Sequence, residues 1–194
     1  MNIIVLGPQG SGKGTQGKKI SRTYGIPHIA TGDELRKMKE LLTPTGRMIK
    51  EVMDSGALVK DDLLIRMIRD RLDRGDTLPG FVLDGFPRTL VQAEALDELL
   101  TELGRSIDVV FEFQVPDRQQ LIDRLTKRAA AENRADDTPE AIQTRLVTYD
   151  RETAPLVEYY RTTRGNVVGI HAERSIDEVF HEIEQSLSAV EARA

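Results

Sequence analysis

Short apolar runs alternate with longer amphipathic stretches along the whole chain. Between the runs, apolar residues recur at helical spacing, and a glycine follows the polar last turn of several stretches, as is typical where helices end. These glycines are Gly25, Gly56, Gly75, Gly104 and Gly165. The apolar runs have the length of buried strands and span residues 2–6, 27–29, 81–84, 109–114 and 166–170. Repeated strand–helix alternation predicts an α/β fold, with a five-stranded parallel sheet and helices on both faces.

Two segments interrupt this alternation and predict insertions. Residues 31–60 show helical patterns without a strand, although they separate the second and third strands. A short polar break follows residue 128 and ends at Thr138 and Pro139, which suit the N-cap and first residue of a helix. Pro155 lies inside the next helical pattern and predicts a break or kink there. We expect a core made of residues 1–30, 61–128 and 138–194, a helical insertion at 31–60 and a short lid at 129–137.

Composition narrows the possible functions. A chain of 194 residues without cysteine can fold as one domain with small insertions and offers no thiolate for disulfides or metals. Its net charge of −5 argues against general binding of nucleic acids. The apolar run at residues 3–6 is too short for a signal peptide and precedes a glycine-rich loop. We expect a cytoplasmic protein with neither nucleic acid nor membrane as a partner, and a monomer by default.

The glycine-rich loop is the strongest chemical signal. Residues 7–15 read Gly-Pro-Gln-Gly-Ser-Gly-Lys-Gly-Thr and join the first strand to a helix. Glycines let successive N–H groups turn toward phosphate oxygens, and the helix directs its positive end to the same place. Lys13 can reach the outer phosphates, and the Thr15 hydroxyl can face Mg²⁺. Because Gly14 follows the lysine, this hydroxyl stands one position later than the strict pattern requires. The loop predicts a fold of the P-loop type.

A second phosphate site is predicted at the end of the third strand. Asp84 ends this strand, where open α/β sheets place their ligands, and its carboxylate can hold the water shell of Mg²⁺. A strand-end aspartate can also cap the next turn, and this alternative stays open. The turn Gly85-Phe86-Pro87-Arg88 brings a guanidinium into the same crevice.

Arginines recur where bound phosphates would lie. Their fixed forks fit phosphate oxygens, and phosphoryl transfer depends mainly on positioning and charge neutralisation. A single arginine is as readily explained by a solvated helix face. Asp136 and Asp137 are placed to pair with these arginines and fix their rotamers. The motifs by which GTPases bind guanine and sense hydrolysis are absent from the sequence. The arginines are Arg36, Arg88, Arg124, Arg128, Arg134 and Arg145.

Together these segments resemble the adenylate kinase family, in its form with a short lid, over nearly the full chain. The matching segments are 7–16, 31–36, 53–59, 80–92, 123–124, 134–137 and 148–160. The resemblance implies reversible transfer of the terminal phosphoryl group of MgATP to AMP, which gives two ADP. It also implies that residues 31–60 bind AMP and that the lid covers ATP.

The resemblance assigns roles residue by residue. ATP would be held by Gly10, Ser11, Gly12, Lys13, Gly14, Thr15 and Arg124, the last also stacking on its adenine. AMP would be held by Thr31, Arg36, Met53, Ala57, Val59, Gly85, Arg88 and Gln92. The transfer site would be lined by Lys13, Arg88, Arg124, Arg128, Arg134 and Arg145. Mg²⁺ would be held, through water, by Thr15 and Asp84. Two departures are Ala57, where many members carry lysine, and Ile170-His171-Ala172, which replaces the usual Asp-Gly pair.

Two other functions compete with this interpretation. A UMP/CMP kinase would share the fold, but such enzymes tend to carry Ala and Asn at the positions of Thr31 and Gln92. A nucleotide-binding module without catalysis would not need two phosphate sites and converging arginines. Zinc is not expected, because the lid is short and cysteine is absent. We assign surface or core roles to His28, His171 and His181, and core packing to Tyr159 and Tyr160.

Overall fold

A five-stranded, entirely parallel sheet forms the centre of the molecule. The computed structural model describes residues 1–132, 134 and 136–192. The strands lie in the order β2-β3-β1-β4-β5, which confirms the predicted α/β fold. Their bounds are β1 Asn2–Leu6, β2 His28–Ala30, β3 Phe81–Asp84, β4 Val109–Gln114 and β5 Val167–His171.

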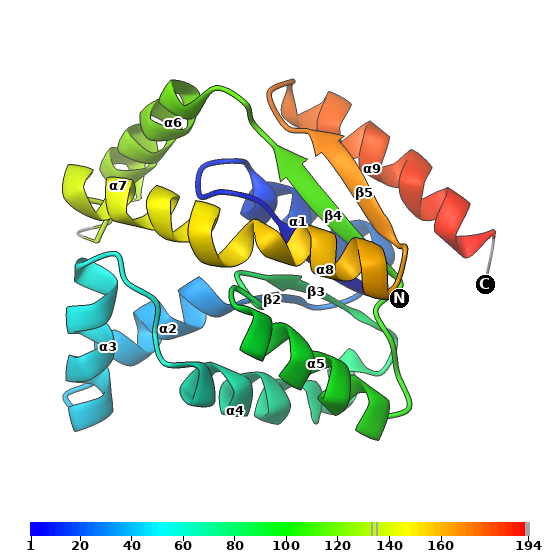
Figure 1. Cartoon of the computed structure of the whole chain (residues 1–194), viewed down its shortest axis with the longest axis horizontal. Coiled ribbons are helices and arrows are strands. Elements are labelled where there is room, and N and C mark those ends of the chain that lie inside the picture. The colour runs from blue at the N-terminus through cyan, green and yellow to red at the C-terminus, as the bar shows by residue number, and fades with distance from the viewer. Residues whose placement is uncertain (133, 135, 193–194) are drawn as a thin grey trace.

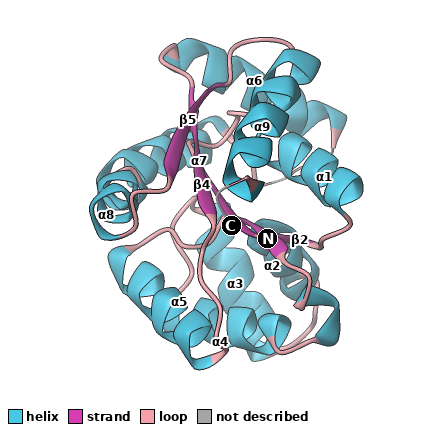
Figure 2. Cartoon of the chain, turned by 90° about the vertical axis from the view of Figure 1, so that its right-hand side faces the viewer, coloured by secondary structure: helices cyan, strands magenta, loops and turns pink. Residues whose placement is uncertain are grey.

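Helices cover both faces of the sheet, as Figure 2 shows with the sheet between two helical layers. Successive strand residues point to opposite faces, so β1 sends Ile4 and Leu6 into one core and Ile3 and Val5 into the other. The first core packs against α3 Pro44–Asp54, α4 Asp61–Leu72, α5 Leu90–Glu102 and α8 Pro155–Thr163. The second packs against α1 Lys13–Tyr24, α6 Arg118–Ala131, α7 Pro139–Thr148 and α9 Ile176–Glu191.

Residues 31–60 hold two helices and no strand. Helix α2 spans Thr31–Lys39, and α3 begins after Thr43, whose side chain accepts a hydrogen bond from the N–H of Gly46. A Cβ on Gly46 would lie 2.3 Å from the carbonyl oxygen of Leu41, so only glycine lets α3 approach the end of α2 this closely. The two helices form one side of the molecule in Figure 1.

A single long helical rod runs from residue 139 to residue 163. Helix α7 passes into a π-helical segment, Tyr149–Thr153, and α8 starts at Pro155. The irregularity predicted at Pro155 is thus a π-helical segment just before the proline. Proline has no backbone N–H to donate to the preceding turn, so the regular hydrogen bonding of a helix cannot continue through it. Figure 1 shows the rod crossing in front of β4 and β5.

Two local predictions were wrong. Gly75 was predicted to end a helix, but α4 is capped at Asp73, and Gly75 starts a 3₁₀ turn, Gly75–Thr77, without a positive φ angle. Gly25, Gly56, Gly104 and Gly165 do have left-handed angles after a helix. The polar break was predicted from residue 129, yet α6 continues to Ala131, because the alanines that follow Arg128 favour helix. Residues 133 and 135 of the predicted lid lie outside the described residues.

Candidate functional site

The carboxyl ends of β1, β2 and β3 open into a cavity of about 630 Å³. The glycine-rich loop, the 31–60 segment and the residues around α6 and α7 all contribute to its walls. With the exception of Gln92, the residues proposed for nucleotide, metal and transfer sites line it. They are Gly10, Ser11, Gly12, Lys13, Gly14, Thr15, Thr31, Arg36, Met53, Ala57, Val59, Asp84, Gly85, Arg88, Arg124, Arg128, Arg134 and Arg145.

The glycine-rich loop is a backbone cradle in front of α1. Gly10 and Gly12 have φ angles of 85° and 92°, which favour glycine. Helix α1 begins at Lys13, and no side chain in the described part of the chain caps its first turn. The first N–H groups of α1 are therefore available to an anion.

Lys13 lies folded against the loop that carries it. Its Nζ donates hydrogen bonds to the carbonyl oxygens of Gly7, at 2.6 Å, and Pro8, at 2.8 Å. Burial lowers the pKa of Lys13 to about 8; the charges of Arg88 and Arg128 lower it too, against the opposing effect of Asp84. The ammonium is thus held among like charges, where phosphate oxygens would stabilise it.

Asp84 has a neighbour that the sequence analysis missed. His28 Nε2 lies 3.3 Å from Asp84 Oδ2, because β2 pairs directly with β3. Gly17 makes room for the imidazole, since a Cβ there would lie 2.6 Å from His28 Nε2. Burial opposes the charge of Asp84, but the hydrogen bond from His28 and the charge of Lys13 outweigh it and hold the pKa of Asp84 below its ordinary value. An ionised carboxylate here suits a hard cation.

The same aspartate lies close to Gly14. A Cβ at this position would lie 3.3 Å from Asp84 Oδ2, so a larger residue would require the carboxylate to shift by a few tenths of an ångström.

Asp136 and Asp137, in the predicted lid, pair with neighbouring arginines, as the sequence predicted. Asp137 accepts from Arg128 Nε at 3.1 Å and Nη2 at 2.6 Å, and it also pairs with Arg145. Asp136 accepts from Arg145 Nη2 at 2.9 Å. Both aspartates are buried, at 1% and 6% exposure, so each buried charge is paired and the guanidinium planes are fixed.

Lys39 joins this network from α2, which the sequence analysis did not foresee. Its Nζ lies 3.4 Å from Asp136 Oδ1 and 3.5 Å from Asp54 Oδ1 at the end of α3. Arg36 approaches Asp136 Oδ2 to 3.8 Å. Burial works against the charge of Asp136, but Arg145 and Lys39 outweigh it and lower its pKa. The 31–60 segment is thereby linked to the start of the rod.

Three further arginines contact the backbone or a neighbouring carboxylate. Arg88 Nε donates to the carbonyl oxygen of Gly85 at 2.8 Å, and burial lowers the pKa of Arg88. Arg124 Nη1 donates to the carbonyl oxygen of Ala172 at 3.0 Å, which places it beside the segment after β5. Arg134 Nε lies 2.5 Å from Glu132 Oε2.

Gln92 is the one proposed site residue that does not line the cavity. It is fully buried, its Nε2 donates to Asp61 Oδ1 at 2.6 Å, and its Oε1 accepts from the backbone N–H of Arg88 at 2.8 Å. Asp61 was not predicted as a site residue. The sequence gives little reason to single out Asp61, because the helix dipole alone explains an aspartate in the first turn of a helix.

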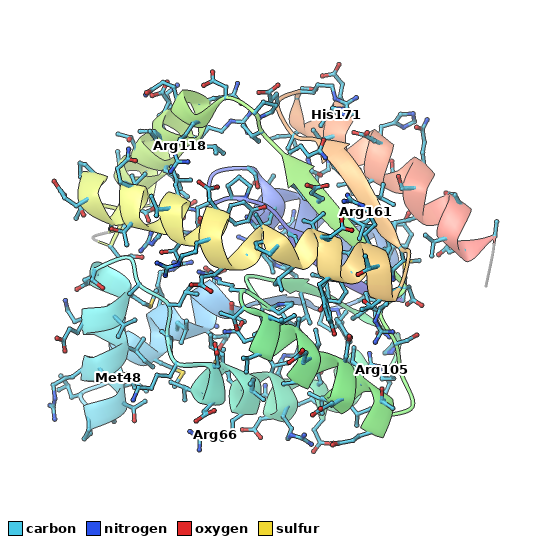
Figure 3. The ribbon with its side chains drawn as sticks, viewed as in Figure 1. Met48, Arg66, Arg105, Arg118, Arg161 and His171 are labelled. Atoms are coloured by element: carbon cyan, nitrogen blue, oxygen red, sulfur yellow. The ribbon has the colours of Figure 1, made fainter. Side chains whose placement is uncertain are left out.

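Other charged groups lie on the outer surface, as the labelled side chains of Figure 3 illustrate. Arg118 on α6 pairs with Asp150 at 2.7 Å, and Arg105 donates to Asn2 and stacks over Phe81. His171 is exposed beside Glu182, as predicted. Among the described residues, no group of three or more His, Cys, Asp or Glu side chains is placed to hold a metal ion. No helix in the described ranges is both long and apolar enough to cross a membrane.

Comparisons with known proteins agree on one family. A family model described as adenylate kinase matches residues 5–165. An adenylate kinase of Xanthomonas euvesicatoria pv. vesicatoria is 44% identical over 187 residues, which cover 96% of this chain and 99% of that protein. An adenylate kinase of Methylobacterium nodulans is 44% identical over 197 residues, with 98% of each chain covered. One from Caldanaerobacter subterraneus subsp. tengcongensis is 40% identical, with 96% of each covered.

Proposed function

Because the chain belongs to the adenylate kinase family and so transfers a phosphoryl group between ATP and AMP, we propose that it does so directly and in line, without a phosphoenzyme. One observation carries this mechanism: the groups proposed for the transfer site come from distant parts of the chain and line one cavity. They are Lys13, Arg88, Arg124, Arg128, Arg134 and Arg145. Such a site neutralises charge and fixes position, which is what phosphoryl transfer requires.

ATP binds on the glycine-rich loop in this proposal. The backbone N–H groups around Gly10, Gly12 and Gly14 hold its phosphates, Lys13 holds the outer ones, and the start of α1 adds its positive end. Arg124 supports the adenine, because its contact with Ala172 places the guanidinium between the loop and the end of β5. Since a phosphate anion would raise the pKa of Lys13, binding favours the charged ammonium.

AMP binds on the other side of the cavity, against the 31–60 segment. Arg36 and Arg88 hold its phosphate, and its base lies among residues from Met53 to Val59 and beside Gly85. The support for this is their shared wall in the cavity. Thr31, whose hydroxyl donates to the carbonyl oxygen of Gly85 at 2.9 Å, ties the two halves of this wall together. Ala57 offers no polar side chain to the nucleotide.

Mg²⁺ fits the oxygen groups at the centre of the cavity. Thr15 and the ionised Asp84 are hard donors, and two protein oxygens leave room for the waters and phosphate oxygens that Mg²⁺ prefers. When bound, the ion would supply positive charge that offsets the charge of the phosphates. Asp84 would hold its water shell, and His28 keeps that carboxylate in place. Zinc has no part in the proposal.

In this proposal the core and the lid contribute different groups to the transfer site. The core carries Lys13, Arg88 and Arg124, while Arg134 and the Asp136–Asp137 pair belong to the lid. Closing of the lid would complete the arginine set and exclude water, which makes water a poor competing acceptor. A monomer in the cytoplasm stays a prediction.

AMP is proposed as the preferred acceptor, with Gln92 reading its base. A buried polar group that loses its partner costs about 1–3 kcal/mol, which corresponds to roughly ten- to a hundredfold in affinity. The test is ADP formation from MgATP with AMP, CMP, UMP or GMP as acceptor, for the wild type and Gln92→Ala. Equal use of CMP and AMP by the wild type would favour a UMP/CMP kinase, and trapping of a phosphorylated chain would exclude direct transfer.

A further inference from the structure

Arg88 lies in the cavity without a carboxylate partner. Arg145 is fixed by an ion pair with Asp137, whereas no carboxylate in the described part of the chain forms a salt bridge with Arg88. Burial lowers the pKa of Arg88, and the charges of Arg145 and Arg36 lower it further, although Asp84 opposes them. Like charges thus repel this guanidinium, so contacts with neutral groups must hold it in place.

Most hydrogen bonds of Arg88 are made within its own turn. Its Nε donates to the carbonyl oxygen of Gly85 at 2.8 Å, and its backbone N–H donates to Gln92 Oε1 at 2.8 Å. Because both partners lie within four residues of Arg88, they move together with it. The carbonyl oxygen of Arg88 accepts from Thr153 Oγ1 at 2.9 Å, from 65 residues further along the chain. Among the described residues, Thr153 is the one hydrogen-bond partner that ties Arg88 to a distant element.

Thr153 lies in the π-helical segment of the rod, where its hydroxyl donates outside its own helix. A threonine within a helix commonly donates to the carbonyl four residues back, as Thr162 does to Glu158 at 2.9 Å later in the same rod. In the π segment the N–H of Ala154 bonds instead to the carbonyl of Tyr149, five residues back. Such widened turns are frequent at functional sites.

We propose that Thr153 is a positioning residue for phosphoryl transfer, because its hydroxyl holds the main chain of Arg88 and so sets where that guanidinium lies relative to Arg145. The inference rests on the proposed role of Arg88 in the transfer site. Both arginines line the cavity, and Arg145 is carried by the same rod as Thr153. Thr153 is only 7% exposed, and a carbonyl oxygen can only accept, so its hydroxyl proton is committed to Arg88. Since transfer depends on positioning, a small displacement of Arg88 costs rate.

The experiment compares Thr153→Val with Thr153→Ser. Valine has nearly the shape of threonine but no hydroxyl, whereas serine keeps the hydroxyl and loses a methyl group. Thr77→Val is the matched control, since Thr77 is also buried, lies outside the cavity wall and donates its hydroxyl to the carbonyl oxygen of Leu72 at 2.8 Å. For each protein kcat and the KM for AMP are measured at saturating MgATP, and thermal unfolding is followed to verify folding.

In Thr153→Val we expect kcat to fall by about tenfold, with the KM for AMP changed by less than about twofold. Thr153→Ser should keep most of the wild-type kcat, and Thr77→Val should keep all of it. If Thr153→Val does not fold at the assay temperature, the comparison of Thr153→Ser with Thr153→Ala decides the matter. These two variants differ only in the hydroxyl.

A double variant tests whether Thr153 acts through Arg88. When Thr153→Val is added to Arg88→Lys, kcat should fall by much less than the factor it loses in the wild-type background. The reason is that two residues in direct contact that serve one function are not additive. A residue that only supported the fold would instead lower kcat by the same factor in both backgrounds.

Each part of the inference can be overturned separately. A wild-type kcat in Thr153→Val would refute it outright, and equal losses in Thr153→Val and Thr153→Ser would attribute the effect to packing. An equal loss in Thr77→Val would attribute it to any buried hydroxyl, and a full further loss in the double variant would separate Thr153 from Arg88. If Arg88→Lys leaves kcat unchanged, the proposed role of Arg88 is itself wrong. A loss in Arg88→Lys without one in Thr153→Val refutes the positioning role alone.

Discussion

Lys39 Nζ lies 3.4 Å from Asp136 Oδ1, so a buried ion pair joins α2 to the turn before α7. Only 8% and 2% of the two side chains are exposed. Lys39 also approaches Asp54, and Arg145 Nη2 donates to the carbonyl oxygen of Met53 at 3.1 Å. The contact between the 31–60 segment and the predicted lid is thus made by protein groups with limited exposure to water.

Replacing Lys39 by methionine should destabilise the protein, because Asp136 would keep its charge and lose one partner. We expect the free energy of unfolding to fall by about 1–3 kcal/mol, measured by urea denaturation. Lys37→Met is the matched control, since Lys37 pairs with Glu34 on the exposed side of α2. A change of the same size in both variants would show that the loss reflects helix charge and not the buried pair.

The lowered pKa of Lys13 predicts a pH dependence of ATP use. In the free enzyme the ammonium loses its proton above about pH 8, so kcat/KM for ATP should fall between pH 8 and 10.5. The turnover number should hold to higher pH, because bound phosphates stabilise the charged form. Steady-state rates across this range, measured at saturating AMP, provide the check. Parallel losses of kcat and kcat/KM would contradict it.

The lowered pKa of Lys13 affects stability in the opposite direction to activity as the pH rises. Below pH 8 Lys13 is charged in the folded and the unfolded state. Between pH 8 and its ordinary value of 10.5, the unfolded state binds more protons. The contribution of Lys13 to the free energy of unfolding therefore rises with pH in this window. Activity and stability should diverge above pH 8, which thermal melts in parallel with the assays would reveal.

Arg88→Lys and Arg134→Lys should reduce turnover more than they reduce nucleotide affinity. Lysine keeps the charge and loses the planar fork, so a contact that strengthens in the transition state is the one most affected. We expect kcat to fall on the order of a hundredfold. Arg161→Lys, on the exposed face of α8, is the control. Calorimetric affinities measured alongside kcat would identify binding anchors if affinity alone declined.

Removal of divalent cations should abolish activity, and Mg²⁺ alone should restore it. Among the described residues the hard oxygens of Thr15 and Asp84 suit Mg²⁺, whereas no cluster of zinc-type ligands accompanies them. The experiment is chelation with EDTA, followed by titration with Mg²⁺ and by metal analysis of the purified protein. Stoichiometric zinc in that analysis would disprove the prediction.

Tyr160→Phe should be neutral or stabilising by up to about 1 kcal/mol. Tyr160 is fully buried, burial raises its pKa, and its hydroxyl has no hydrogen-bond partner within the described residues. Tyr159→Phe is the matched variant and should destabilise, since Tyr159 donates to Asp97 at 2.9 Å. The melting temperature should fall only in Tyr159→Phe, and a loss in Tyr160→Phe equal to that in Tyr159→Phe would reject this account.

The sheet was predictable because its evidence is local. Each strand is a short apolar run, and the bounds of the run at 109–114 match β4. Helix ends were harder to predict from the sequence. Gly75 follows a polar turn, as a capping glycine does, yet the chain forms a 3₁₀ turn there. The loop and the arginines carry their chemistry in residue type and spacing, which is why they could be singled out.

The missed residues share another property: their roles depend on partners distant in sequence. His28 meets Asp84 only because β2 lies next to β3, and Lys39 meets Asp136 across 97 residues. Asp61 meets Gln92 only because α4 packs beside α5. Each of these residues also has an ordinary local explanation, so spacing alone gave no reason to prefer the distant partner.

The helical rod has a mechanical consequence. Helix α7 carries Arg145 at the cavity, and α8 carries Tyr160 in the core, so the segment before α7 is attached to a continuous helix with a buried anchor. The π segment, Tyr149–Thr153, interrupts the regular hydrogen bonding of that helix. Thr153, within this segment, donates to the carbonyl oxygen of Arg88 at 2.9 Å. A rotation of the rod would therefore act on the backbone of Arg88 as well as on the predicted lid.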